Sequence, residues 1–249
     1  MSRNDEEIVR YSLTKGVARL TMDDGGRNLI SPTMLRQLNT ALDKAEAANA
    51  VVILTGRPGI FSAGFDLRIL KTGVRDTYNM LIGGFELSRR LLDFPTPVLI
   101  ACSGHAIAMG AFLLLSGDYR IGAQGDFRIV ANEVAIGLTV PHAAIEICRQ
   151  RLRSGHFERA VLLSEQYSPV SAVDAGFLDS VVPDDRLMMA ASELAAQYAA
   201  LDLKAHHQSK RRLRQTQLKK LRQAIWEDRR DFIAQGIQRL VRTQAGRKG

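Results

Sequence analysis

The sequence lacks the features that mark several classes of protein. Its 249 residues include only two cysteines, Cys102 and Cys148, in apolar surroundings and without the spacing of a metal site. We therefore expect core thiols rather than a disulfide. No apolar run reaches the ~18 residues needed to span a bilayer. The segment at residues 1–10 is polar and acidic, unlike a signal or transit peptide. These absences predict a cytoplasmic protein with no membrane partner.

Net positive charge is absent from most of the chain and concentrated near its end. Composition is otherwise that of a globular protein, 46% hydrophobic and 24% charged. Residues 204–249 carry 14 basic and 3 acidic side chains, a balance of +11, whereas residues 1–203 have a balance of −3. This asymmetry is typical either of an anionic partner or of a solvated helix face.

The hydrophobic pattern predicts an α/β fold. Two short strands joined at Lys15-Gly16 precede a helix that Ser31 would cap. The β-branched runs at 50–56 and 96–104 are typical of strands buried on both faces, and each leads through small residues into a helical pattern. Two further short strands and mostly helical sequence from Ala143 follow. That helical part is interrupted by one strand and ends in a pair of helices over 205–243.

Small residues occupy the two loops that follow the buried runs. In "FSAGFDL" (61–67) and "GHAIAMGAF" (104–112) they permit a ligand to approach backbone N–H groups at the start of a helix. Two such loops side by side would aim two N–H donors at one point and form an oxyanion hole. Either loop alone is more typical of tight packing of a helix on a sheet than of a ligand site.

Five motifs together resemble the enoyl-CoA hydratase/isomerase (crotonase) family. The resemblance implies a ClpP/crotonase spiral of ββα units with a helical C-terminal region. It implies a core at residues 1–203, and a region at 204–249 that serves trimerisation and closes the CoA site. A homotrimer or dimer of trimers, an acyl-CoA substrate and no further cofactor are also implied. The motifs are "NLIS" (28–31), "FSAGFDL" (61–67), "GHAIAMGAFLLLSGDYRIGA" (104–123), "NEVAIGL" (132–138) and "SAVDAGFLDSVVP" (171–183).

The resemblance also assigns roles to individual residues. It implies that the backbone N–H groups of Ala63 and Met109 hold the thioester oxygen, with Met109 at a position where the family usually has glycine. It implies no metal. A basic residue near the C-terminus, for which Arg242, Arg247 and Lys248 are candidates, would approach the CoA phosphates. The residues implied to contact substrate or CoA are Arg27, Asn28, Leu29, Ala63, Phe65, Asp66, Leu67, Gly110 and Phe112.

One departure from the family pattern favours one of the family's reactions over the others. Hydratases of the family resemble two-carboxylate enzymes, but the first glutamate position here is Phe112, and the second is Glu133. A single carboxylate suits the conversion of 3-enoyl-CoA to 2-enoyl-CoA in fatty-acid β-oxidation. There Glu133 would remove the C2 proton and return it to C4. Burial among apolar neighbours should raise the pKa of Glu133 toward neutrality.

Several alternatives remain open from sequence. Glu133 could instead pair with a core arginine, Arg120 or Arg128, in a purely structural role. Other family chemistry, such as enoyl-CoA hydration or acyl-CoA hydrolysis, would reuse the same oxyanion hole. A non-catalytic acyl-CoA- or RNA-binding homologue would use the basic segment 204–249. Against RNA, apolar residues recur in that segment at helical spacing, as in helices that pack.

Overall fold

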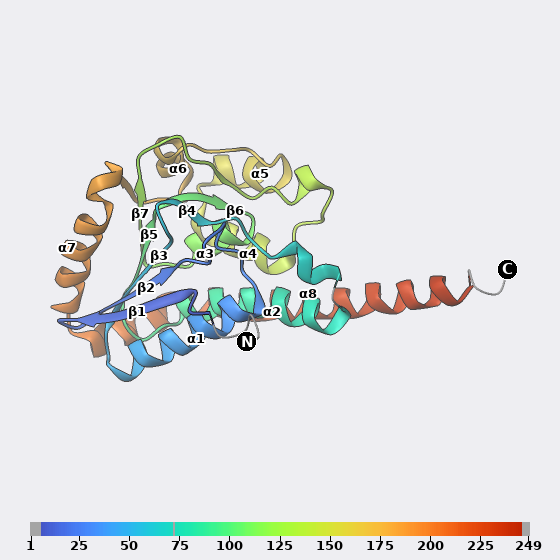
Figure 1. Ribbon diagram of the computed structural model, residues 1–249, viewed down its shortest axis with the longest axis horizontal. Helices are drawn as coiled ribbons and strands as arrows, with labels where there is room; N and C mark the ends of the chain where they lie inside the picture. Colours follow the sequence, from blue (N-terminus) through green and yellow to red (C-terminus); the bar gives the residue numbers. More distant parts are fainter. Residues whose placement is uncertain (1–5, 72, 246–249) are drawn as a thin grey trace.

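Two β-sheets form the centre of the molecule, and most of their strand pairs are parallel (Figure 1). The computed structural model describes residues 6–71 and 73–245. The larger sheet has the order β1-β2-β3-β5-β7-β9 and the smaller the order β4-β6-β8. The strands of the larger sheet are β1 (Val9–Thr14), β2 (Val17–Met22), β3 (Val51–Thr55), β5 (Val98–Cys102), β7 (Tyr119–Ala123) and β9 (Ser180–Val182). Those of the smaller are β4 (Gly59–Ser62), β6 (Gly104–Ile107) and β8 (Ile129–Val130).

The local signals at the start of the chain are confirmed. β1 and β2 form an antiparallel hairpin whose turn places Lys15 at φ 48° and Gly16 at φ 76°. Helix α1 (Pro32–Ala47) begins where expected, and the Ser31 hydroxyl accepts a hydrogen bond from the Met34 N–H at 3.1 Å. This bond satisfies one of the N–H groups that lack a partner at a helix start.

The two β-branched runs are the buried central strands of the larger sheet, as predicted. Every residue of β3 and β5 is buried. Helix α7 (Leu187–Ala199) covers one face of this sheet, and the main core with α1 lies on the other (Figure 1). The remaining helices are α2 (Val74–Leu92), α3 (Met109–Leu114), α4 (His142–Arg151), α5 (Ser154–Leu162), α6 (Pro169–Ala175) and α8 (Leu203–Ala245). The described residues also form three short 3-10 helices, η1 (Leu67–Lys71), η2 (Val134–Ile136) and η3 (Asp184–Arg186).

Two expectations about secondary structure are wrong. The segments after the buried runs do not enter helices directly, because each first forms a short strand, β4 or β6, that pairs with the other. These strands are four residues long and depend on pairing between distant segments, which local periodicity does not reveal. The expected closing pair of helices is the single helix α8. No glycine or proline occurs from Leu203 to Gln235, so nothing in the chain forces a break there.

Helix α8 packs on α2 and α4 along its first part and then projects beyond the rest of the molecule (Figure 1). Leu218, Leu221 and Ile225 are buried in the core, as their helical spacing predicts. Trp226, the next residue along the helix, is 55% exposed, and the Arg230 guanidinium lies 4.8 Å from its ring centroid.

Charged side chains tie α8 to the body of the fold. The Asp118 carboxylate accepts from Lys210 Nζ at 2.7 Å and from Arg214 Nη1 at 2.8 Å, and all three side chains are largely buried. Asp118 Oδ2 also accepts from the Val98 N–H, which fixes it to the start of β5. In the described ranges, no helix has the length and apolar character that crossing a membrane requires.

Candidate active site

Three loops meet at one edge of the smaller sheet. β4, β6 and β8 are parallel neighbours, with Ser62 opposite Ala106 and Ile107 opposite Val130. The carboxyl ends of parallel strands share an edge, so the segments that follow these strands lie together. They are residues 63–66, 108–110 and 131–137, and they contain the residues to which the sequence assigned chemistry.

Glycines allow the first two of these loops to pack directly on each other. Gly64 has φ +90°, and a Cβ built on it would lie 2.9 Å from the Ile107 oxygen and 3.3 Å from the Met109 nitrogen. A Cβ on Gly110 would lie 2.2 Å from the Ser62 oxygen. Larger residues at these glycines would push the loops apart. The expected side-by-side arrangement of the two loops is confirmed.

The N–H groups available at this junction differ from the expected pair. The Ala63 N–H donates to the Arg27 carbonyl at 3.0 Å, which removes Ala63 from the expected donors. The Gly64 N–H donates to Ser62 Oγ at 3.2 Å. Within the described part of the chain, the N–H groups of Phe65, Met109 and Gly110 donate to no protein acceptor. The Met109 nitrogen is the one next to the first loop, 3.3 Å from a Cβ built on Gly64, so Phe65 and Met109 form the pair on facing loops that is available to a ligand.

The turn into α3 is strained. Ala108 precedes the helix with φ 51° and ψ −122°, a conformation that side-chain-bearing residues rarely adopt. Such backbone strain costs on the order of 1–3 kcal/mol and persists where surrounding contacts hold it. Here the Ala108 N–H donates to the Val130 carbonyl at 2.9 Å, which ties the turn to β8.

The substrate-contact residues expected near the first loop divide into structural and accessible ones. Asn28 is fully buried, and its Nδ2 donates to the carbonyls of Met22 and Phe61, so its side chain joins this loop to the smaller sheet. Arg27 is exposed and Leu29 is half-buried. The side chains that remain open to a ligand in this segment are therefore those of Arg27 and Leu29.

Asp66, which the resemblance places among the substrate contacts, caps the turn that follows the loop. Its Oδ1 accepts from the Arg68 N–H at 3.0 Å, and Arg68 Nε and Nη2 bind the carboxylate at 2.9 Å. The hydrogen bond from the Arg68 side chain lowers the pKa of Asp66. Asp66 is thus an ionised, engaged carboxylate, while the neighbouring Leu67 is 53% exposed.

A cluster of aromatic rings surrounds Phe112, the position at which the resemblance implies the first glutamate of a hydratase. Phe112 is 1% exposed, and its ring lies 6.3 Å from that of Phe85 on α2. Phe85 in turn makes an edge contact with Phe65, at 6.1 Å between centroids. These three rings offer no group that could hold a water molecule or move a proton.

Glu133 is a buried carboxyl group, 7% exposed, for which the described residues supply no counter-ion. Among the same residues, its Oε2 has no hydrogen-bond partner. Burial raises the pKa of Glu133 to about 7. Its carbonyl accepts from the N–H groups of Ile136 and Leu138, which closes the loop around it. The Glu133 backbone is therefore held in place while Oε2 is buried without a partner, a state that costs free energy and is typical of a reacting group.

The structural alternative for Glu133 is wrong. Arg120, one of its two proposed partners, binds Asp179 through two contacts, Nε to Oδ2 at 2.9 Å and Nη2 to Oδ1 at 2.7 Å. Among the residues that the structure describes, no basic side chain forms an ion pair with Glu133, and this includes Arg128. The same residues contain no cluster of His, Cys, Asp and Glu that could hold a metal ion.

The candidates for binding the CoA phosphates cannot be placed. Arg247 and Lys248 lie outside the described residues, and for Arg242 only the backbone is described, as part of α8.

Comparison with known proteins agrees with this arrangement. The profile of the family described as enoyl-CoA hydratase/isomerase matches residues 12–243. The chain belongs to the enoyl-CoA hydratase/isomerase family. A solved family protein from Pseudomonas syringae is 46% identical, with a TM-score of 0.88, over 90% of this chain and 97% of that one.

Solved members of the family carry the names of two activities. An enoyl-CoA hydratase from Mycobacterium ulcerans is 42% identical, with a TM-score of 0.87, over 90% of this chain and 99% of its own. The human mitochondrial Δ3-Δ2-enoyl-CoA isomerase is 26% identical, with a TM-score of 0.82, over 98% of this chain and all of its own. The crotonase fold, with two sheets and a long C-terminal helix, and an acyl-CoA substrate follow from this membership.

Proposed function

We propose that this protein converts 3-enoyl-CoA thioesters to 2-enoyl-CoA thioesters with Glu133 as its single acid and base. The Glu133 carboxylate removes a proton from C2, and the electron pair of that C–H bond passes into a dienolate. The negative charge on the thioester oxygen is held by the N–H groups of Phe65 and Met109. The Glu133 carboxylic acid then returns the proton to C4, which leaves the double bond between C2 and C3.

The observation that carries the proposal is the buried, unpaired Oε2 of Glu133 on the loop edge that also holds the two available N–H groups. A pKa of about 7 means that the group is present in both protonation states near neutrality. A group that must first accept and then donate the same proton works best in that range. Each oxyanion donor typically contributes about 2.7–4 kcal/mol to an anionic intermediate.

Exclusion of water favours isomerisation over hydration. Hydration needs a water molecule positioned by a second carboxylate, and Phe112 occupies that position behind Phe85. An apolar wall also protects the dienolate from protonation by solvent. Among the family names, the human relative described as a Δ3-Δ2-enoyl-CoA isomerase supports the same assignment.

An assay that follows two substrates tests the proposal. Purified protein is incubated with 3-hexenoyl-CoA and, separately, with crotonyl-CoA, and the absorbance of the conjugated thioester is followed. We expect conversion of the first and little hydration of the second, with a roughly 10²–10⁴-fold loss of isomerisation in Glu133→Gln. Efficient hydration of crotonyl-CoA, or release of free CoA by hydrolysis, would overturn the isomerase assignment.

For the assembly, we propose a homotrimer or a dimer of trimers in which residues 204–249 contribute contacts between subunits and close the CoA site. The part of α8 that projects from the body supports this assignment, because it leaves a long helical surface outside the fold of one chain (Figure 1). Light scattering on a size-exclusion column would report the mass. A monomer at micromolar concentration would refute it.

A further inference from the structure

The side chains of the two proposed oxyanion residues rest on the same glycine of α2. A Cβ built on Gly84 would lie 2.6 Å from Cε1 and 2.7 Å from Cζ of Phe65. The same built atom would lie 3.4 Å from Cε of Met109. Phe65 and Met109 come from different loops, and Gly84 lies in the interior of a helix that follows neither strand directly. One backbone position thus contacts both residues.

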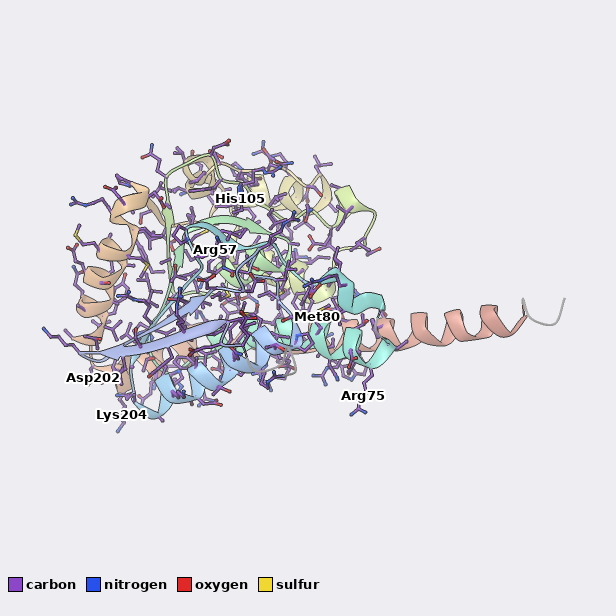
Figure 2. All side chains as sticks on the ribbon, in the orientation of Figure 1. Arg57, Arg75, Met80, His105, Asp202 and Lys204 are labelled. Carbon is purple, nitrogen blue, oxygen red and sulfur yellow. The ribbon has the colours of Figure 1, made fainter. Side chains whose placement is uncertain are left out.

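Gly84 is an unusual residue for its place. Glycine is the poorest helix former after proline, and α2 carries two in succession in its interior, Gly83 and Gly84. Gly84 lies on the buried face of α2, as does Met80, whereas Arg75 points outward (Figure 2). The contact distances give a reason for glycine at 84, because any side chain there would overlap the Phe65 ring.

Two further contacts surround this position. The partly buried Phe65 ring makes an edge contact with Phe85, and Met109 is fully buried. Interiors packed this densely respond to an added methyl group by shifting whole residues. We expect part of a shift of the Phe65 ring to reach its backbone N–H, because Gly84 and Phe85 both contact the ring and Gly64 beside it contacts the Met109 loop.

We infer that Gly84 is a positioning residue for the oxyanion hole: its bare backbone sets the distance between the Phe65 and Met109 N–H groups through the side chains that rest on it. The inference builds on the proposed function, since it concerns the same pair of donors. Gly84 itself touches no substrate atom in this assignment and acts only through Phe65 and Met109.

Gly83 provides a matched control on the same helix. A Cβ on Gly83 would lie 3.0 Å from Cδ1 of Leu35, the far end of a flexible side chain on α1, and near neither loop. Gly83→Ala and Gly84→Ala therefore make the same change to helix propensity, but only Gly84→Ala meets the Phe65 ring. Any difference between the two variants reports the contact with the loops.

The first readout is the kinetics of 3-hexenoyl-CoA isomerisation. Gly84→Ala is expected to lower kcat by about tenfold or more, since small misplacements of a catalytic group have effects of this size. KM should change by less than about threefold, because the interaction that is lost forms chiefly in the transition state. Gly83→Ala should keep the kcat of the parent protein. Equal kcat in both folded variants would overturn the inference.

The second readout does not require turnover. The carbonyl of bound [1-13C]hexanoyl-CoA, which has no double bond to shift, should absorb at a lower infrared frequency than the free thioester. We expect Gly84→Ala to lose a large part of that frequency shift and Gly83→Ala to retain it. If the parent protein shows the shift but does not isomerise, the proposed reaction fails while the inference about Gly84 stands. A full shift in Gly84→Ala would contradict the inference.

A substitution in the loop covers the case in which Gly84→Ala does not fold. Phe65→Leu keeps the backbone N–H but removes the ring that rests on Gly84, so it should itself reduce both kcat and the carbonyl shift. Adding G84A to F65L should lower kcat by less than about threefold further, because the ring that the methyl group meets is gone. A parent-like carbonyl shift and kcat in F65L would also overturn the inference.

Discussion

Glu133 should make the protein less stable as the pH rises through neutrality. Burial raises its pKa from 4.5 to about 7, so between these values the native state holds a proton that the unfolded state has lost. The free energy of unfolding therefore falls as pH rises across that range. Above pH 7 the deficit is about 3 kcal/mol, from about 1.4 kcal/mol for each unit of pKa.

Glu133→Gln should remove this pH dependence. The amide stays neutral, so at pH 8 we expect a gain of about 1–3 kcal/mol, reduced from the full deficit by the cost of burying the amide. For a chain of this length that is a rise in Tm of about 3–10 °C. At pH 4.5 or below the gain should largely vanish, because Glu133 is then mostly protonated in the native state.

Thermal unfolding at pH 4.5 and pH 8, at one protein concentration, measures the effect. Glu46→Gln is the control, since the Glu46 side chain is 52% exposed in its ion pair with Arg90 and should change Tm little at either pH. A Glu133→Gln protein that is less stable than the parent at pH 8, or equally shifted at both pH values, would refute the idea that Glu133 is a buried, uncompensated charge.

Two further substitutions test other parts of the structure. Asp118→Ala leaves Lys210 and Arg214 buried without their counter-ion and should lower the free energy of unfolding by about 3–5 kcal/mol in urea titrations, whereas Asp43→Ala, which breaks a surface ion pair, should cost less than about 1 kcal/mol. Equal losses in the two would contradict the tie between α8 and the core. Ala108→Gly should raise the free energy of unfolding by about 1 kcal/mol, because glycine tolerates φ 51°, and a loss would show that the turn is unstrained.

The sequence predicts those structural elements that depend on only a few neighbouring residues. The hairpin at Lys15-Gly16 and the helix start at Ser31 depend on turn and cap chemistry over a few residues, and both are confirmed. β4 and β6 stayed hidden because their pairing depends on segments more than 40 residues apart. The expected break in α8 has no counterpart in local chemistry, because no glycine or proline lies between Leu203 and Gln235.

The residues of the candidate site also differ in whether the sequence predicts their roles. Glu133 stood out because a carboxylate in an apolar stretch conflicts with its surroundings, and the structure places it buried and unpaired. Phe65 as a donor left no such signal, since every residue except proline has an N–H. Only the bond from Ala63 to Arg27 shows which N–H is already engaged. No sequence pattern predicts the role of Gly84, because that role depends on three segments that meet only in the folded chain.

The path of the proton is the most direct measurement to make. 3-Hexenoyl-CoA deuterated at C2 would be converted by the protein in ordinary water, and the product's deuterium at C4 measured by NMR. If Glu133, shielded from solvent, both removes and returns the proton, part of the deuterium must appear at C4. Product with hydrogen alone at C4 in every molecule would contradict a mechanism in which Glu133, shielded from solvent, carries the same proton from C2 to C4.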